Sequence, residues 1–550
     1  MSARLSPSYR SAAVSALAGE FDVLVVGGGV VGAGAALDAA ARGLSVALVE
    51  AEDWAAGTSS RSSKLIHGGL RYLEQRDFAL VREALRERSL LLHRLAPHLV
   101  RPVPFLFPLR HGGWERAYVG AGVALYDSIG GARALPMHRH LSRRKALTLA
   151  PALRPDALTG AVRYYDAQVD DARLTMMIAR TAAQHGATVL TRARVTGLLT
   201  AGRDVIGARV VDLLSGTEHS VRARRVIGAA GVWTGELCAL APAPAPFEIR
   251  MSKGVHFLVP REKIRLDIGL ITRTEKSVLF VIPWSRYWIV GTTDTPWESD
   301  RSRPAATTAD IDYLLKHVNA ELRTPLSAGD IVGVYAGLRP LLAGRSSETT
   351  KLSREHTVAE PTPGFFVVAG GKYTTYRVMA ADVVDAATRG LGRAVAPSLT
   401  RHLPIHGAVG YRELCATRFA VAARAGLPPA TVERLLGRYG SAVTELLTMI
   451  ETDRSLADPL PGAPNYLAAE AVYAVTHEGA LDLEDILARR TRIAIEYPDR
   501  GMAAAHPVAG LIAPHLDWDA GETQAAVAGY RATARADLAA HSPTTALTPS

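Results

Sequence analysis

One uninterrupted stretch, residues 21–50, constrains the fold of this chain more than any other. It opens with an apolar run at residues 21–26 that is β-branched and has no alternating polar positions. This pattern is typical of a strand that is buried on both faces of a sheet. Glycines follow with the spacing G-x-G-x-x-G, at Gly27, Gly29 and Gly32, and Gly28 belongs to the same turn. A buried strand that runs directly into such glycines predicts a nucleotide-binding turn.

The residues after the glycines complete a βαβ unit. The Ala-rich stretch 33–42 predicts a helix, and Gly43 can end it. Residues 45–49 predict a second buried strand, and Glu50 closes it 23 positions after Gly27. The glycines let the backbone approach a pyrophosphate at the helix N-terminus, and the carboxylate can accept hydrogen bonds from an adenosine ribose. Because Glu50 leaves no room for a 2′-phosphate, the unit predicts FAD or NAD rather than NADP.

The loop at residues 58–72 favours FAD over NAD. It is rich in hydroxyl groups and then in glycine, a composition that also occurs in flexible linkers, but it carries charged and aromatic side chains that such linkers lack. The loop resembles the segment under the flavin in the FAD-dependent glycerol-3-phosphate dehydrogenase family, within the wider glycine/D-amino-acid oxidase superfamily. The resemblance implies cofactor contacts from Thr58, Ser59, Ser60, Lys64, Leu65, His67 and Gly68, besides Gly27, Gly28, Gly29, Gly32 and Glu50.

Separate blocks further along the chain resemble the same family in the same order. Residues 226–234 resemble the segment that meets the FAD pyrophosphate, which implies contacts from Gly231 and Trp233. Residues 366–377 form an apolar run, a glycine pair and a hydroxyl-rich helix start. The resemblance places this block at the pyrimidine end of the flavin, with contacts from Gly371, Lys372, Thr374 and Thr375. The other blocks are residues 253–260, 282–295, 335–341, 352–356 and 483–492, so the resemblance extends from residue 18 to residue 540.

These blocks predict an α/β fold with an FAD-binding, Rossmann-like domain of the glutathione-reductase or D-amino-acid-oxidase type, a β-rich substrate domain and a C-terminal all-helical cap. A chain of 550 residues is too long for one core. Residues 1–19 are expected to be a loosely ordered lead-in. We expect the FAD-binding domain in three parts, 18–95, 161–245 and 336–398, with a substrate or cap segment at 96–160, the substrate domain at 246–335 and the helical domain at 400–550.

The resemblance implies oxidation of sn-glycerol 3-phosphate to dihydroxyacetone phosphate, in which hydride passes from C2 to flavin N5 and a base takes the hydroxyl proton. A bound phosphate dianion needs fixed cations, and a guanidinium group can hold it with two hydrogen bonds. Arginines in the family-like blocks are the candidates: Arg339 and Arg71 are the first choices, and Arg354 is the second. Tyr72 is expected to help bind the phosphate or to shape the pocket.

Proton transfer needs a group that titrates near neutral pH. The resemblance makes His256 the candidate base or the partner that orients the C2 hydroxyl, although a lone histidine on an apolar strand is more often a core residue. Lys372 is expected to stabilise negative charge on the reduced flavin or on the substrate alkoxide. The predicted catalytic residues are therefore His256, Lys372 and Arg339. Two residues depart from the family pattern, Arg61 among the serines of the flavin loop and Tyr373 after Lys372.

Charge, cysteine content and apolar runs limit which partners and which cellular location we expect. The net charge is +10, but the basic clusters are short and scattered and lack interleaved aromatic residues, so we expect no nucleic-acid partner. The two cysteines, Cys238 and Cys415, predict neither a disulfide nor a metal site, which is typical of a reducing compartment. The chain begins without a signal-peptide pattern and contains no apolar run of the ~20 residues that a membrane span needs. We therefore expect a cytoplasmic protein.

The residues leave the electron acceptor open. Dehydrogenases of this family deliver electrons to membrane quinone, which implies a quinone partner and a peripheral contact with the anionic cytoplasmic face of the plasma membrane. An apolar Pro-broken strip such as that around residues 105–107 usually lines a core, and a surface that contacts the membrane or the quinone is the less favoured alternative. One alternative is a glycerol-3-phosphate oxidase that uses oxygen, and another is a non-catalytic basic binding protein that keeps the flavin fold. A homodimer is compatible with the same observations.

Overall fold

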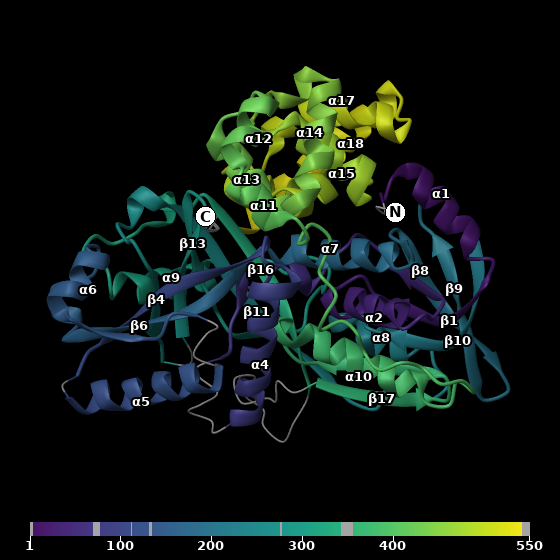
Figure 1. Cartoon of the computed structure of the whole chain (residues 1–550), viewed down its shortest axis with the longest axis horizontal. Helices are drawn as coiled ribbons and strands as arrows, with labels where there is room; N and C mark the ends of the chain where they lie inside the picture. Colours follow the sequence, from purple (N-terminus) through teal and green to yellow (C-terminus); the bar gives the residue numbers. More distant parts are fainter. Residues whose placement is uncertain are drawn as a thin grey trace, which may run out of the picture.

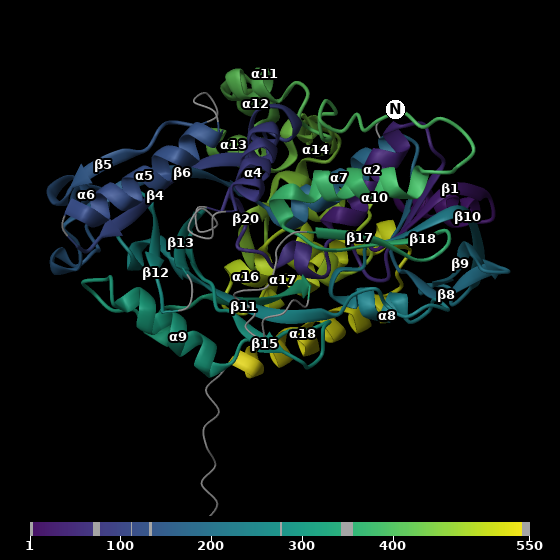
Figure 2. The same ribbon diagram turned by 90° about the horizontal axis from the view of Figure 1, so that it is seen from below.

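The computed structural model describes residues 4–69, 77–111, 113–130, 135–275, 278–342 and 356–541. Two sheets with their helices and a lobe of C-terminal helices make up this part of the chain (Figure 1, Figure 2). In Figure 1 the smaller sheet lies on the right, the larger sheet extends to the left, and the C-terminal helices, coloured green to yellow, form a lobe above both.

The smaller sheet is built around β1 (Glu20–Val26), the apolar run that precedes the glycines. β1 pairs in parallel with β2 (Val46–Val49) and β10 (Glu218–Gly228), and β10 pairs in parallel with β18 (Phe365–Gly370). The other strands are β7 (Thr188–Leu190), β8 (Ala193–Ala201), β9 (Asp204–Asp212) and β17 (His356–Thr362). Within the described ranges the sheet has eight strands in the order β17-β18-β10-β1-β2-β7, with β9 beside β10 and β8 beside β9. This is the predicted parallel nucleotide-binding layer.

Three helices cover one face of this sheet, α2 (Val30–Ala41), α7 (Asp171–Gln184) and α10 (Tyr376–Thr388). Their apolar side chains and those of the strands form one core. Because α2 consists mainly of alanine and glycine and is almost entirely buried, α7 and α10 can pack closely against it. The opposite face packs against α1 (Pro7–Ala16) and α8 (Thr234–Cys238).

Helix α1 shows that the prediction of a loosely ordered lead-in is wrong for the described part of residues 1–19. Ser6 caps the helix by accepting a hydrogen bond from the Tyr9 amide, and Pro7 occupies its first turn. Arg10 forms an ion pair with Asp212 of β9, and Leu17 is buried against the sheet. These contacts lie far from α1 in sequence, which is why a local composition argument does not reveal them.

The larger sheet carries the β-rich part of the chain. Its strands are β3 (Leu65–Ile66), β4 (Val100–Leu109), β5 (Arg139–Ser142), β6 (Gly160–Val169), β11 (Ile249–Pro260), β12 (Gly269–Arg273), β13 (Val278–Trp284), β14 (Tyr287–Gly291), β15 (Thr295–Trp297) and β16 (Gly333–Leu342). Across the described residues these ten strands follow the order β15-β11-β14-β13-β12-β4-β6-β3, with β16 beside β11 and β5 beside β6. One face packs against α4 (Phe78–Leu90) and α5 (Gly113–Gly130), and the other against α6 (Arg143–Leu149) and α9 (Thr308–Asn319).

In this region one expectation is wrong and one alternative is excluded. Strands β6 and β16, which we placed within the FAD-binding parts of the chain, are instead members of the larger sheet, because β6 pairs with β4 and β16 with β11. The strip at residues 105–107 is not a surface, since Phe105 and Leu106 are fully buried and Phe107 nearly so. β4 has neighbours on both sides and helices on both faces, so this strip belongs to the core and cannot contact a membrane.

The C-terminal lobe contains α11 (Tyr411–Ala416), α12 (Arg418–Ala425), α13 (Pro429–Tyr439), α14 (Val443–Thr452), α15 (Ala468–Glu478), the π-helical turn η11 (Asp485–Arg490), α16 (Ile493–Glu496), α17 (Met502–Leu516) and α18 (Ala520–His541). A short ribbon of β19 (Pro459–Leu460) and β20 (Ala463–Leu467) is the exception to its helical character. These helices share a core of their own. None of the helices in the described ranges combines the length and apolarity that crossing a bilayer requires.

Candidate functional site

A cavity of about 560 Å³ lies where the parallel strands of the smaller sheet end. Its lining includes the last residues of β1, β2 and β18 and the residue after β10, namely Val26, Val49, Gly370 and Ala229. Ligands of open α/β sheets bind at this edge. The predicted cofactor residues that line the cavity are Gly27, Gly29, Glu50, Thr58, Ser59, Gly231, Trp233, Gly371 and Lys372.

The glycines of the first turn are required by close contacts. Gly27 has a φ of 113°, and a Cβ on it would lie 2.6 Å from the Ala229 carbonyl oxygen. A Cβ on Gly32 would lie 1.8 Å from the carbonyl oxygen of Gly27. Gly28 does not line the cavity, and a side chain there would meet Glu50 and Trp54 at 2.8 Å. These contacts leave a bare backbone at the N-terminus of α2, which fits a pyrophosphate.

Glu50 provides the acidic end of the cavity. Its Oε2 accepts a hydrogen bond from the Gly28 amide at 2.5 Å, and its Oε1 accepts one from the Glu52 amide at 2.7 Å. Burial raises the pKa of Glu50 to about 6, and the two amides oppose this shift. The carboxylate therefore lies beside the glycine turn, as a ribose acceptor must.

The flavin loop begins with the short 3₁₀ turn η1 (Thr58–Ser60) and joins the two sheets. Ser59 Oγ accepts a hydrogen bond of 3.0 Å from the Val30 amide in the first turn of α2. Thr58 Oγ1 donates to the Leu338 carbonyl oxygen of β16 at 2.7 Å. Arg61, one of the two departures from the family pattern, donates to the Ser302 carbonyl oxygen, so it holds the flavin loop against the segment between β15 and α9.

Several predicted cofactor residues lie outside the described lining of the cavity, namely Gly28, Gly32, Ser60, Lys64, Leu65, His67, Gly68, Thr374 and Thr375. The side chain of Lys64 is fully buried and forms an ion pair with Asp171 at 2.9 Å. Burial and the neighbouring Arg492 lower the pKa of Lys64 to about 8, although Asp171 opposes them. Thr374 Oγ1 donates to the His67 carbonyl oxygen, which holds the flavin loop against the segment after β18. Any cofactor contact from these residues stays a prediction.

Two of the predicted substrate residues, Arg339 and His256, lie on one face of the antiparallel pair β11 and β16. The register places Ser252 opposite Arg339, Gly254 opposite Gly337 and His256 opposite Tyr335. Arg339 donates hydrogen bonds to Ser252 Oγ at 3.2 Å and to Thr292 Oγ1 at 3.1 Å. A Cβ on Gly254 would lie 2.5 Å from the guanidinium group, so this glycine makes room for Arg339.

His256 is buried between the flavin loop and Tyr335. Its Nε2 lies 2.8 Å from Ser63 Oγ, and its ring stacks on Tyr335 with the centroids 4.9 Å apart and an angle of 8°. Its Nδ1 has no hydrogen-bond partner among the described residues. Burial first, and then the nearby Arg339 and Lys64, lower the pKa of His256 well below its usual value, which favours the neutral ring. This differs from the expected titration near neutral pH. Neither His256 nor Arg339 is part of the described cavity lining.

Lys372 is the predicted catalytic residue that the cavity contains. It precedes the turn η8 (Tyr373–Thr375), and the hydroxyl of Tyr373 donates to the Asp171 carbonyl oxygen at 2.6 Å. The predicted substrate residues Arg71, Tyr72 and Arg354 lie outside the described residues. In the part of the chain that the structure describes, no group of three or more His, Cys, Asp or Glu side chains could hold a metal ion.

Three site residues escaped the sequence analysis: Ser63, Asp171 and Arg492. Ser63 contacts His256, and Asp171 contacts both the flavin loop and Arg492 of the C-terminal lobe. The signal for Asp171 is a pair of acids, Asp170 and Asp171, directly after a strand and before a helix. No spacing in the sequence connects this pair with Arg492, which lies more than 300 positions away.

Comparison with known proteins agrees with this architecture. A family described as FAD dependent oxidoreductase matches residues 22–383, and one described as C-terminal domain of alpha-glycerophosphate oxidase matches residues 398–523. A protein named "Glycerol-3-phosphate dehydrogenase 2" from Mycobacterium tuberculosis is 56% identical over 537 residues, which cover 98% of this chain and 92% of that relative. The chain belongs to the FAD-dependent glycerol-3-phosphate dehydrogenase family.

More distant members of the glycerol-3-phosphate dehydrogenase family extend the comparison. The human protein named "Glycerol-3-phosphate dehydrogenase, mitochondrial" is 36% identical over 526 residues, covering 91% of this chain and 71% of that protein. A crystal structure of the glycerol-3-phosphate dehydrogenase from Bacillus halodurans complexed with FAD superimposes with a TM-score of 0.80 at 27% identity, covering 99% of this chain and all of that one. The predicted fold class and FAD as the cofactor are confirmed, and the protein is an oxidoreductase.

Proposed function

We propose that this oxidoreductase oxidises sn-glycerol 3-phosphate to dihydroxyacetone phosphate. The names of relatives at 55% and 56% identity support this substrate. The observation that supports it most directly is the placement of Arg339 and His256 on one face of β11 and β16, next to the flavin loop. The substrate offers one group for each residue, a phosphate dianion for the guanidinium group and a hydroxyl proton for the imidazole.

The spacing of these two residues suits a small substrate. The guanidinium group of Arg339 lies over Gly254, two residues from His256 along β11. Two residues of a strand span roughly 7 Å. A molecule that carries a phosphate close to a secondary alcohol can contact both side chains at once. Arg71 and Arg354 are proposed as further phosphate ligands and Tyr72 as a neighbour of the same pocket.

The chain's own groups then have distinct tasks. FAD, when bound, supplies the acceptor for the two electrons that leave the substrate. The neutral form of His256, which its lowered pKa favours, can accept the hydroxyl proton, directly or through the Ser63 hydroxyl that contacts Nε2. Lys372 places a positive charge in the cavity, where negative charge on oxygen or on the reduced cofactor is stabilised. Burial of His256 keeps bulk water away from the proton transfer.

We further propose that a membrane quinone is the electron acceptor and that the protein works at the cytoplasmic face of the membrane. The net charge of +10 favours an anionic surface, which adds about 1 kcal/mol for each basic residue close to it. Such binding is electrostatic, so high salt should release the protein from vesicles that contain anionic lipid.

The substrate proposal can be tested by mixing the FAD-loaded protein with sn-glycerol 3-phosphate without oxygen. We expect the absorbance of oxidised flavin to bleach and one dihydroxyacetone phosphate to form per flavin. Glycerol 2-phosphate is a matched control, because it has the same charge but carries its phosphate on C2, where the substrate has the hydroxyl group that is oxidised. Equal bleaching with both compounds, or none with either when dithionite still reduces the flavin, would reject the proposal.

The acceptor is tested in turnover with a quinone analogue or with oxygen. The proposal predicts that the quinone supports much faster turnover than air. Formation of one hydrogen peroxide per substrate in air, with no gain from added quinone, would instead identify a glycerol-3-phosphate oxidase.

A further inference from the structure

We propose that Arg492, in the C-terminal lobe, is a positioning residue for the reaction end of the site. It acts through Asp171, which fixes the flavin-loop residues that hold His256. This inference rests on the proposed function, in which His256 accepts the substrate proton. If Arg492 has this role, the C-terminal lobe helps to position the residues that react.

Asp171 is the point at which the segments around the site are joined. Its Oδ2 accepts hydrogen bonds from the backbone amide of Ser62 at 2.9 Å and from the Ser62 hydroxyl at 2.7 Å. Its Oδ1 accepts one from Lys64 Nζ at 2.9 Å. Its carbonyl oxygen accepts the hydroxyl of Tyr373, which lines the cavity. One residue at the start of α7 therefore holds both the flavin loop and the segment after β18.

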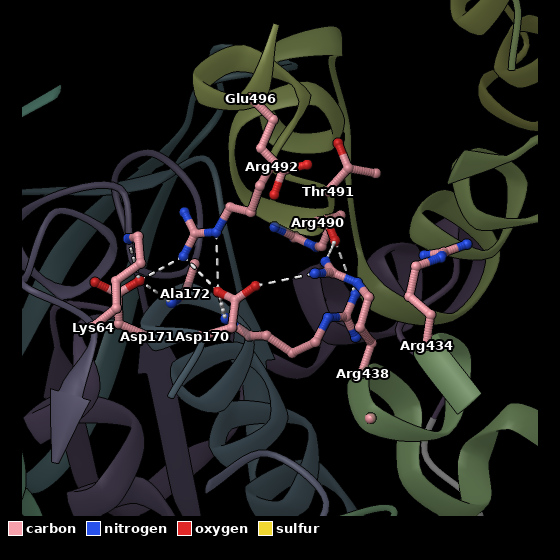
Figure 3. Close-up of polar contacts among 12 residues, drawn as sticks. Lys64, Asp170, Asp171, Ala172, Arg434, Arg438, Arg490, Thr491, Arg492 and Glu496 are labelled. Atoms are coloured by element: carbon pink, nitrogen blue, oxygen red, sulfur yellow. Dashed lines mark hydrogen bonds and ion pairs between the residues drawn. The ribbon is translucent and has the colours of Figure 1, made fainter. Parts of the chain in front are cut away.

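Arg492 fixes this carboxylate from the other lobe. Figure 3 shows its guanidinium group beside Asp170 and Asp171, with Lys64 on the far side of Asp171. Nη2 of Arg492 lies 2.5 Å from an oxygen of each aspartate, and Nε donates to Asp170 at 3.0 Å. Arg438 also binds Asp170, at 3.2 Å, so Arg492 is the arginine that reaches Asp171. The Arg492 side chain is 3% exposed. Its removal would leave the negative charges of two adjacent buried carboxylates, Asp170 and Asp171, without one of their balancing cations.

The flavin loop transmits this restraint to His256 through two contacts. The Ser62 carbonyl oxygen accepts the hydroxyl of Tyr335 at 3.0 Å, and the ring of Tyr335 stacks on His256. The next residue, Ser63, contacts His256 Nε2. Lys64 Nζ lies 4.7 Å from the centre of the same Tyr335 ring. A shift of the backbone at Ser62 therefore alters both groups that orient the imidazole.

A second ion pair between α7 and the C-terminal lobe provides a matched control. Arg180 Nη2 donates to Glu445 Oε2 at 2.7 Å, and Nη1 donates to the hydroxyl of Tyr473 at 2.6 Å. Arg180 is buried like Arg492, but it lies nine residues beyond Asp171, about 14 Å along the helix. Like Arg492, Arg180 binds α7 to the C-terminal lobe, through hydrogen bonds to Glu445 and Tyr473.

The test compares Arg492→Gln with Arg180→Gln as FAD-loaded proteins. Hydrogen exchange, measured without substrate, should quicken at least tenfold at the amides of residues 58–69 in Arg492→Gln. Its rate of flavin reduction by sn-glycerol 3-phosphate should fall at least tenfold, with a substrate dissociation constant within twofold of the wild-type value. Arg492→Lys should recover part of that rate, because it restores the charge but not the two-sided contact. Arg180→Gln should leave the exchange rates of residues 58–69 and the rate of flavin reduction within twofold of the wild-type values.

Two results would overturn the proposal: unchanged exchange and reduction in Arg492→Gln, or equal effects of both variants with exchange raised throughout the lobe interface. If Arg492→Gln fails to fold, Ser62→Ala decides, because it removes one Asp171 contact without burying a charge. It should quicken exchange in the same loop and slow reduction at least threefold, and no change would reject the proposal. If wild-type protein does not react with sn-glycerol 3-phosphate, only the proposed function is rejected. The hydrogen-exchange comparison still tests the role of Arg492, because it needs no substrate.

Discussion

The cofactor turn and the reaction end of this site are built in different ways. The turn, residues 27–32, comes from one continuous segment and works through its backbone, because side chains at Gly27 and Gly32 would collide with neighbouring carbonyl groups. The proposed reaction end consists of side chains such as Arg339 and His256, which two strands far apart in the sequence place on one face. If the proposed roles are right, the contiguous turn governs cofactor binding, and the assembled side chains govern which substrate reacts.

The two regions also differ in electrostatics. At the acidic end of the cavity, burial raises the pKa of Glu50, and backbone amides surround the carboxylate. At the reaction end, positive groups at Arg339 and Lys64 add to burial in lowering the pKa of His256. The first environment suits hydroxyl groups of a ribose, and the second suits an anionic substrate and a neutral base. Substitutions should therefore separate cofactor binding from chemistry.

The largest effect is expected in the turn. In Gly32→Ala the new Cβ would lie 1.8 Å from the Gly27 carbonyl oxygen, and forced overpacking of this kind costs about 1–3 kcal/mol or more. We expect purified protein without bound FAD and with a lowered Tm. Gly235→Ala is the control, because a Cβ there meets nothing within 4 Å, and its FAD content should be normal. A Gly32→Ala protein that keeps one FAD per chain would contradict the role of the turn.

At the reaction end, His256→Asn should change the chemistry and spare the cofactor. Loss of a general base typically slows a reaction ~10²–10⁴-fold, so we expect a loss of that order in anaerobic flavin reduction. The FAD content and the substrate dissociation constant should change little, because the lost interaction belongs to the transition state. Stopped-flow absorbance measures the rate, and an unchanged rate would reduce His256 to a packing residue.

The smallest effect concerns pH and cofactor binding. Below its pKa of about 6, Glu50 is protonated in the protein without FAD and must release a proton before it can accept two ribose hydroxyl groups. The Kd for FAD should therefore rise as pH falls below about 6, by up to about tenfold per pH unit, and be constant above it. Fluorescence titration of the apoprotein measures this, and Glu50→Gln should abolish the pH dependence. A wild-type Kd that stays constant from about pH 5 to pH 8 would contradict the assignment.

The same contrast explains how far the sequence predicts the molecule. The βαβ unit is predictable because strand, glycines, helix and acid are neighbours in the sequence. The strand and the helix form where predicted, and Gly27, Gly29 and Glu50 line the cavity. His256 and Arg339 are predictable only as candidates, since strand pairing places them together. The contact between Asp171 and Arg492 is not predictable, because a buried contact between lobes has no local pattern.

Two proline-containing segments show the limits of a local argument. At residues 105–107 the prolines left a membrane-facing surface open as the less favoured alternative to a core position, and β4, with strands on both sides, buries the strip. Helix α17 lies within the predicted helical domain although it carries Pro507 and Pro514, which locally disfavour a helix interior. In both places packing against the rest of the molecule outweighs the local preference of proline.

The central claim, that side chains on β11 and β16 select a phosphorylated alcohol, is tested most directly by comparing sn-glycerol 3-phosphate with glycerol in anaerobic reduction of wild-type and Arg339→Ala protein. Leaving part of a buried dianion unpaired costs about 2–5 kcal/mol, so the variant should lose most of the preference for the phosphorylated substrate. Its FAD content and its reduction by glycerol should stay the same, and Arg250→Ala, which changes a partly exposed arginine on the neighbouring strand β11, should behave as wild type. If Arg339→Ala keeps the wild-type preference, or loses FAD while the remaining holoenzyme reacts normally, Arg339 is structural and the account is wrong.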